Sequence, residues 1–248
     1  PKTGTFNPNA VAFSNVTVLA NNIWLKNKTA NAIIKKAAFN EISGLHLKDL
    51  KLSLNATDTN LNITNLHTAL NDNKLQGNLR LEYPTLSSLI EAPEKTSVNV
   101  NVPSFKIALQ DVFFIAPELK KNPYINALSK KPLGGAIAAR GVLSNINASN
   151  FNVNWGASTK ISAQGTIKNA TQQENLHFII PDFRAVTTRT DVSKFINEKE
   201  LGVTLPANIK LSGAIEGGIN TINTNAIIKT SQGNATIKGS IENGEIIA

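Results

Sequence analysis

The stretch LKDLKLSLNATDTNLNITNL, residues 47 to 66, places an apolar residue at nearly every second position, with Asn, Thr, Ser, Lys and Asp between them. Successive side chains of a β-strand point to opposite faces, so this alternation predicts strands with one apolar face and one polar face. Most proteins bury such an apolar face against a second layer. The same pattern also fits an open surface that is kept apolar for a ligand.

Period-two alternation recurs along most of the chain, for example in residues 151 to 155, 176 to 180 and 209 to 211. Short polar turn signals separate many of these runs, as at residues 71 to 73 and 216 to 218. Alternating runs joined by such turns indicate antiparallel meander connections. The sequence therefore predicts an all-β fold with a few short helices.

Glycine recurs in the pattern apolar-x-Gly-x-apolar, centred on Gly77, Gly141, Gly165, Gly213 and Gly239. The last four are 24, 48 and 26 residues apart, which we interpret as one unit, two units and one unit, each with room for two strands. Glycine on the apolar face lets a strand bend, and bends at one level would curve the whole sheet. Bulges in an ordinary barrel or sandwich are the alternative.

Three amphipathic segments interrupt the β pattern and predict short helices: residues 85 to 92, 111 to 130 and 190 to 200. Pro117 and Pro123 interrupt the second, and Thr190 or Asp191 is a candidate cap for the third. The third segment lies where the 48-residue interval lacks a glycine. We expect these helices to plug an end or to cover part of an apolar surface, with a moving lid as the alternative.

Composition excludes several classes of protein. The chain has 248 residues, 41% of them hydrophobic, which is enough for one large all-β domain or two small ones and argues against disorder. The absence of cysteine excludes disulfides and thiolate metal sites. The net charge of +8 is scattered, with no basic run interleaved with aromatics, so we expect a solvated basic surface and no nucleic-acid partner, with a weak attraction to anionic lipid head groups as the alternative.

No apolar run approaches the roughly 18 residues that a membrane-spanning helix requires, and no signal peptide is recognisable. The sequence begins at Pro1 and contains no methionine. We therefore expect a piece of a longer protein, with any membrane anchor or export signal outside it.

No motif nominates an enzyme. His46, His67 and His177 are far apart in sequence and none has metal-ligand spacing to another ligand, so we expect surface histidines. The chain lacks a nucleophile elbow, a P-loop, a zinc-protease motif and an EF-hand loop, and the pair Asp182 and Asp191 has no special context. The sequence predicts a non-enzymatic protein with no cofactor and no metal.

Several stretches resemble a known family. The residues that carry the resemblance are Ser43-Gly44-Leu45-x-Leu47-x-x-Leu50, Leu61-x-Ile63-x-x-Leu66, Leu75-x-Gly77-x-Leu79-x-Leu81-x-Tyr83, and residues 113 to 123 and 205 to 241. These stretches are similar to bacterial TamB and AsmA-like envelope proteins, in the form found in long Bacteroidota members. The matches span most of residues 39 to 248.

The resemblance implies a long antiparallel sheet curled into a taco-like apolar groove. It also implies a periplasmic segment of a protein anchored in the inner membrane, which conducts phospholipid acyl chains toward the outer membrane and supports outer-membrane assembly. TamB itself partners an outer-membrane barrel of the Omp85 type, so a TamA-like barrel is the implied partner. The family has no catalytic residues to carry over.

On this interpretation residues 1–248 form one continuous β-groove segment. Residues 1–38 are its least certain strand region, 39–110 a first β unit, 111–132 a helical insertion, and 133–248 repeated β units with a short helix near 190–200. The predicted lining is the inward-facing apolar set Leu50, Leu52, Leu54, Leu61, Ile63, Leu79, Leu81, Phe151, Val153, Trp155, Ile161, Ile167, Phe178, Ile209, Leu211, Ile215, Ile237 and Ile241.

Two other functions remain open from the sequence. One is a structural or adhesive module of a cell-surface protein, a β-sandwich or solenoid whose apolar faces are merely core. The other is a glycan-binding or glycan-cleaving β-protein, which would need a row of exposed aromatics. With 2 Trp and 2 Tyr, the chain is poorly suited to the second.

Overall fold

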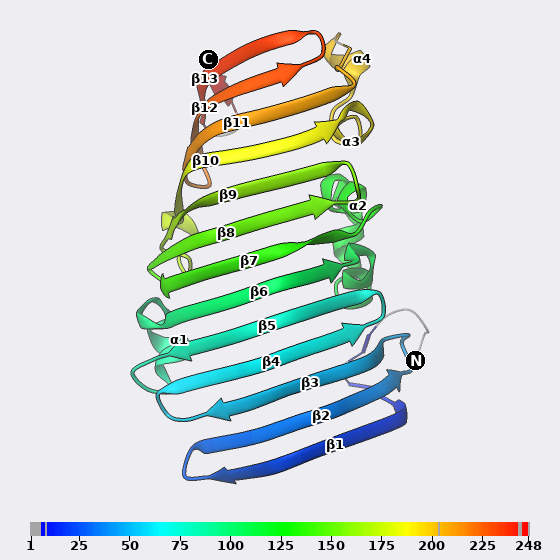
Figure 1. Ribbon diagram of the computed structural model, residues 1–248, viewed down its shortest axis with the longest axis vertical. Coiled ribbons are helices and arrows are strands. Elements are labelled where there is room, and N and C mark those ends of the chain that lie inside the picture. Colours follow the sequence, from blue (N-terminus) through cyan, green and yellow to red (C-terminus); the bar gives the residue numbers. More distant parts are fainter. Residues whose placement is uncertain (1–5, 8, 203, 243–244, 248) are drawn as a thin grey trace. The chain divides into compact units, whose positions relative to one another are not determined.

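The computed structural model describes residues 6–7, 9–202, 204–242 and 245–247. Its fourteen described strands belong to one open sheet, in which the spatial order from β1 to β14 follows the sequence order. Figure 1 shows this order for the labelled strands β1 to β13. The prediction of an all-β, antiparallel fold with only short helices is confirmed. The predicted curl of this sheet into a groove stays a prediction.

Close contacts divide the chain into two compact units. Unit 1 comprises Pro1–Ser87 and Val100–Gly135, and unit 2 comprises Ser88–Asn99 and Ala136–Ala248. Each unit has its own strands and short helices.

Unit 1 is built on long strands joined by tight turns. It contains β1 (Phe13–Lys26), β2 (Thr29–Glu41), β3 (His46–Ala56), β4 (Asn60–Leu70), β5 (Asn73–Glu82) and most of β6 (Ser97–Ile107). Asn27 and Lys28 both have positive φ, 47° and 61°, as a type I′ hairpin turn requires. Residues 13 to 41 therefore form an antiparallel strand pair, although three shifts in its pairing obscure the alternation in the sequence.

Unit 2 continues the same meander. It contains most of β7 (Leu133–Val142), then β8 (Asn145–Trp155), β9 (Thr159–Lys168), β10 (His177–Thr188), β11 (Asn208–Gly217), β12 (Thr221–Thr230), β13 (Gly233–Glu242) and β14 (Glu245–Ile247). The four pairs from β8 to β12 are antiparallel and nearly all residues of each strand are paired.

The three predicted helical segments are present, each shorter than expected. The segment predicted at residues 111 to 130 corresponds to the 3-10 helices η2 (Leu109–Phe114) and η3 (Pro117–Lys121) and the helix α2 (Pro123–Leu128). Prolines begin the second and third of these, where a missing N–H costs nothing. Asn122 caps α2, since its side-chain oxygen accepts the N–H groups of Tyr124 and Ile125 at 3.0 and 3.1 Å.

The helices of unit 2 are single turns. They are α1 (Ser88–Glu91), η1 (Pro93–Lys95), η4 (Gln173–Asn175), α3 (Arg189–Val192) and α4 (Glu198–Leu201). The predicted cap at Thr190 or Asp191 is wrong, because α3 already begins at Arg189 and its cap residue Thr188 makes no side-chain capping bond. Within the described ranges, no helix is both long and apolar enough to cross a membrane.

The repeated glycines occur once per hairpin, which is more regular than their spacing in the sequence suggested. Gly77, Gly141, Gly165, Gly213 and Gly239 lie on β5, β7, β9, β11 and β13, one on every second strand. The interpretation of the 48-residue interval as two units is therefore wrong. Only β10 lies between Gly165 and Gly213, and the extra length is taken up by η4, α3, α4 and their loops.

Candidate functional site

One face of unit 1 is apolar from β1 to β5. Residues paired directly across neighbouring strands point to the same face of a sheet. The register pairs Ala20 with Ile34, Ile34 with Leu52, Leu54 with Ile63, Ile63 with Leu79 and Leu61 with Leu81. All the lining residues predicted in this unit lie on this face: Leu50, Leu52, Leu54, Leu61, Ile63, Leu79 and Leu81.

A bulge at Asn65 keeps this face apolar along β4. The pairing with β5 shifts between Ile63 and Leu66, and Asn65 has a φ of 53°, a left-handed conformation that Asn tolerates well. Its N–H donates to the side-chain oxygen of Asn78 on β5 at 2.9 Å. The extra residue restores the alternation, so Leu66 points to the same face as Leu61 and Ile63. The spacing Leu61-x-Ile63-x-x-Leu66 is the sequence signal of this bulge, and Leu66 was missing from the predicted lining.

Unit 2 has an apolar face of the same kind. The register pairs Val153 with Ile161, Ile167 with Phe178, Ile180 with Ile215, Thr187 with Ile209 and Ala226 with Ile237. The predicted residues that share this face are Phe151, Val153, Trp155, Ile161, Ile167, Phe178, Ile209, Leu211, Ile215 and Ile237. Ile241 pairs with Ile222 in the same register, and its side chain lies outside the described ones.

Little covers the apolar face in either unit. The described apolar residues that are buried are Ala37, Tyr83, Trp155, Ile209 and Ala226. Most of the predicted lining is half-buried, and Phe151, Ile161 and Ile237 are exposed. Among the strands, exposure is greatest on β1, where Leu25 is 79% exposed. All described strands belong to one sheet, so no second sheet forms the two-layer core of a sandwich among them.

The repeated glycines allow the next strand to approach very closely. A Cβ added at Gly213 would lie 2.1 Å from the carbonyl oxygen of Asn225 on β12, nearer than any real Cβ contact. The corresponding distances at Gly77, Gly141 and Gly165 are 2.6, 2.3 and 2.3 Å, each to a backbone oxygen of the following strand. Each of these odd-numbered strands therefore requires glycine where the following strand comes nearest.

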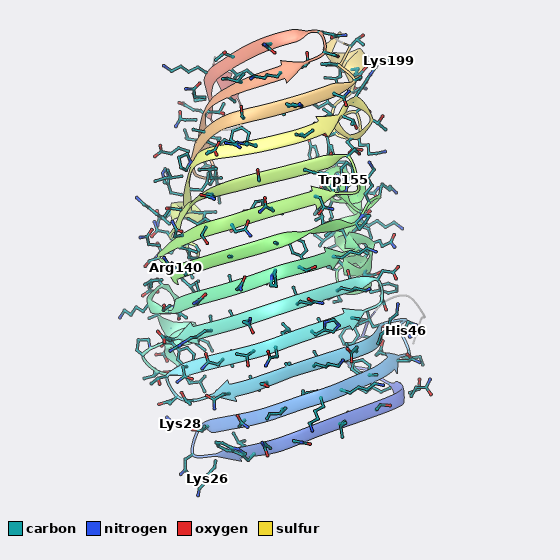
Figure 2. The ribbon with its side chains drawn as sticks, in the orientation of Figure 1. Lys26, Lys28, His46, Arg140, Trp155 and Lys199 are labelled. Carbon is teal, nitrogen blue, oxygen red and sulfur yellow. The ribbon has the colours of Figure 1, made fainter. Side chains whose placement is uncertain are left out.

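One end of the apolar face in unit 2 is covered. Trp155 ends β8 (Figure 2) and is only 4% exposed, because the ring of Phe195 lies over it with the two ring centroids 5.5 Å apart. Phe195 belongs to the segment between α3 and α4. This contact agrees with the expectation that the helices cover part of the apolar surface. It also means that Trp155 is not freely available to a ligand.

A buried carboxylate holds the covering segment. Asp191 of α3 is 1% exposed, and its Oδ2 accepts the hydroxyls of Ser158 and Thr159 at 2.8 and 2.7 Å. The hydroxyls of Thr159 and Thr187 are 2.8 Å apart. Arg189 and Glu198 form a two-point ion pair across the same segment, which raises the pKa of Arg189 and lowers that of Glu198.

Unit 1 has its own polar anchors. The carboxylate of Glu41 accepts the N–H of Ser43 at 2.7 Å as well as its hydroxyl, and the hydroxyl bond is the main cause of the lowered pKa of Glu41. Tyr83 is buried and donates its hydroxyl to the carbonyl of Thr57 at 3.0 Å. Burial, and then the charge of Asp58, raise the pKa of Tyr83.

Among the described residues, no three His, Cys, Asp or Glu side chains gather as they would to hold a metal ion. His67 lies 3.7 Å from Asp49, and His177 lies 3.2 Å from Glu216. Each is a single contact between partly exposed side chains. His46 is exposed and contacts the side chain of Asn40 at 2.9 Å.

The fold and this face define a class: an all-β protein with a single open antiparallel sheet, one face apolar and one face polar. Comparisons with models of known families, with curated proteins and with solved structures found no match. The resemblance to TamB and AsmA-like proteins therefore rests on the sequence motifs and stays a prediction.

Proposed function

We propose that this chain is a segment of a bridge-like lipid-transfer protein of the bacterial periplasm, and that the apolar sheet face conducts phospholipid acyl chains between the inner and outer membranes. One observation carries the proposal. The apolar side chains of each unit share one face of an open sheet, and few of the described residues on that face are buried. The family resemblance supplies the cellular setting.

An open apolar face is costly unless something occupies it. Exposed apolar surface costs about 25 cal/mol per Å², so a face that recurs over many strands favours an apolar partner. An acyl chain gains about 0.8 kcal/mol for each CH2 that leaves water, while its head group stays hydrated beside the sheet. A lipid tail therefore matches the chemistry of this face.

The composition of the face favours movement over tight binding. Its side chains are mainly Leu, Ile, Val and Phe, which offer no hydrogen bond or charge to hold one lipid in place. A tail contacting only aliphatic groups can slide without crossing a large barrier, and selectivity among tails should be low.

The alternative of a sandwich-type adhesive module has less support. A sandwich needs a second sheet about 10 Å away, and all described strands belong to one sheet. The resemblance extends our proposal to an inner-membrane anchor elsewhere in the same protein and to an Omp85-type outer-membrane barrel as partner. We further propose that the chain supports outer-membrane assembly without catalysing a reaction.

The proposal is tested by photo-crosslinking in cells. A photoreactive phenylalanine analogue at Leu52 or Phe151, on the apolar face of unit 1 or unit 2, should capture phospholipid that mass spectrometry identifies. The same probe at Asn62 or Asn147 on the polar face is the matched control. Lipid adducts at neither apolar position, or equal adducts on both faces, would overturn the proposal. Protein adducts in place of lipid would instead identify a second layer supplied by another chain.

A charge substitution separates lipid binding from folding. Leu52→Asp places a carboxylate on the apolar face of β3, and Ser53→Asp places one on the opposite face of the same strand. We expect the first to reduce co-purifying phospholipid at least five-fold and the second to leave it unchanged. Equal lipid content in both variants, with both folded by circular dichroism, contradicts the proposal.

A further inference from the structure

The polar face of unit 2 contains a hollow built by two bulges. The pairing of β8 with β9 shifts between Ala148 and Phe151, and that of β9 with β10 shifts between Ile179 and Asp182. Both shifts flank residues 163–166 of β9. A hollow of about 310 Å³ lies here, lined by Asn150, Asn152, Ser162, Ala163, Gln164, Asp182 and Arg184.

The lining of the hollow supplies both hydrogen-bond donors and hydrogen-bond acceptors. Its three amides both donate and accept, and the Ser162 hydroxyl does the same. Asp182 and Arg184 form an ion pair with 3.5 Å between carboxylate and guanidinium, and both side chains are largely exposed. A ligand rich in hydroxyl groups, which also donate and accept, matches this lining better than a simple anion does.

A row of lysines runs beside the hollow. The register aligns Lys160 of β9, Val186 of β10, Lys210 of β11 and Lys229 of β12 across four neighbouring strands. Lys210 stands directly opposite Lys229, an arrangement of like charges that destabilises a sheet. The next positions of the row are Asn154 and Asn234, so no carboxylate stands directly opposite a lysine of the row.

The two features are adjacent on one face. Lys160 lies two residues from Ser162, and Val186 lies two residues from Arg184, so the row runs about 7 Å from the floor of the hollow. A ligand of a few linked rings can fill the hollow and also reach the lysines. An anionic group on that ligand would relieve the repulsion between Lys210 and Lys229.

We propose that this hollow and the lysine row bind an acidic polysaccharide, a sugar chain that carries carboxylate or phosphate groups. The amides, Ser162 and Asp182 bond the sugar hydroxyls, and Arg184 and the lysines bind the acidic groups. The hollow has no aromatic ring in its lining, so binding depends on charge and falls with salt. This site lies on the face opposite the apolar one and is independent of the proposed lipid function.

Binding is tested with defined probes on the full chain. Isothermal titration with an oligogalacturonate, with neutral maltohexaose and with inorganic phosphate should give the tightest binding for the first. We expect Arg184→Gln to weaken oligogalacturonate binding at least five-fold, and Lys210→Gln with Lys229→Gln to weaken it at least ten-fold. Arg80→Gln is the matched control, since Arg80 also pairs with an acidic residue two positions away on an exposed polar face.

Each other outcome overturns the proposal. If neutral maltohexaose binds as tightly as oligogalacturonate, the lysine row has no role in binding. If inorganic phosphate binds as tightly as oligogalacturonate, the hollow has no role. Absence of binding removes the site. Binding to phosphatidylglycerol vesicles that needs the same lysines, without saccharide binding, would assign the row to an anionic membrane surface. Leu52→Asp should leave oligogalacturonate binding intact, so failure here is distinguishable from failure of the lipid proposal.

Discussion

In unit 1 asparagines with left-handed φ lie at shifts in strand pairing, whereas in unit 2 Gly141, Gly165 and Gly213 lie where the next strand comes close, with Gly77 as their counterpart in unit 1. Asn15, Asn22 and Asn65 have φ between 51° and 53° at shifts in strand pairing. Gly141 and Gly213 have φ of 144° and 158°, with the next backbone where a Cβ would be. Asparagine suffices where one residue must be added, and glycine is required where the neighbouring backbone comes too close for any side chain.

The polar faces differ as well. On the polar face of unit 1, Asp49 lies 3.2 Å from Lys51, and Arg80 pairs with Glu82. On unit 2 the row through Lys210 and Lys229 has no acidic member. Balanced charges are enough for solubility. Of the two polar faces, the one with the lysine row therefore gives the stronger indication of a ligand.

The glycine bends should give the largest effect. Gly213→Ala forces a Cβ into the backbone of β12, and we expect it to lower the free energy of unfolding by about 3 to 5 kcal/mol. Gly233→Ala is the control, because Gly233 also has a positive φ, 140°, but nothing within 4 Å of an added Cβ. Urea unfolding measures both variants. If both variants lose equal stability, the positive φ at these glycines explains the loss, and the close approach of β12 does not contribute.

Asp191 should come next, because it anchors the cover at the end of unit 2. Asp191→Ala removes the acceptor of two hydroxyls, and we expect a loss of about 2 to 4 kcal/mol. Phe195 should then leave Trp155, and the tryptophan emission should shift to the red. Trp24→Phe isolates this signal, because Trp24 is the other tryptophan and lies in unit 1. An unchanged emission maximum would show that Asp191 does not hold the cover.

The asparagine bends should be milder. Asn65→Gly keeps the left-handed conformation accessible and should change stability by less than about 0.5 kcal/mol, whereas Asn65→Ala should cost about 1 kcal/mol. Chemical denaturation resolves the difference. Equal losses for both would mean that the Asn65 side chain, and not its backbone conformation, is what matters.

Low pH should reduce the folding stability of each unit through the protonation of one carboxylate. The pKa values of Glu41 and Glu198 are lowered in the folded chain, so their contributions are complete above the unfolded pKa and are lost as the pH falls through the folded one. We expect urea midpoints to decrease as the pH falls below the ordinary pKa of a glutamate, about 4.3. Trp24 and Trp155 report the two units separately. Glu41→Gln should flatten only the Trp24 profile, and Glu198→Gln only the Trp155 profile.

The fold class and the shared face were predictable because alternation is a local property. The spacing of Leu50, Leu52 and Leu54 fixes which side chains point together, and the register bears this out. The bulge after Ile63 was also visible in the sequence, as a spacing of three, although its meaning depends on the partner strand. Local pattern therefore carried most of the fold.

What escaped prediction depends on distant contacts. Trp155 looks like any other lining residue until Phe195, forty positions later, covers it. In the sequence Asp191 is a candidate helix cap. In the structure its carboxylate instead accepts hydrogen bonds from the hydroxyls of Ser158 and Thr159. The lysine row exists only because Lys160, Lys210 and Lys229 meet through strand register. No local spacing reports such encounters.

The sequential strand order affects how the sheet can gain or lose strands in evolution. Each strand is bonded only to the strands before and after it in the chain, so the contacts are local and a new hairpin can form on one already in place. Insertion or loss of one glycine-containing hairpin by gene duplication or deletion leaves the remaining pairings intact. Each such event changes the width of the sheet by about 10 Å, twice the spacing between strands. Evolution can thus adjust the reach of this protein in fixed steps.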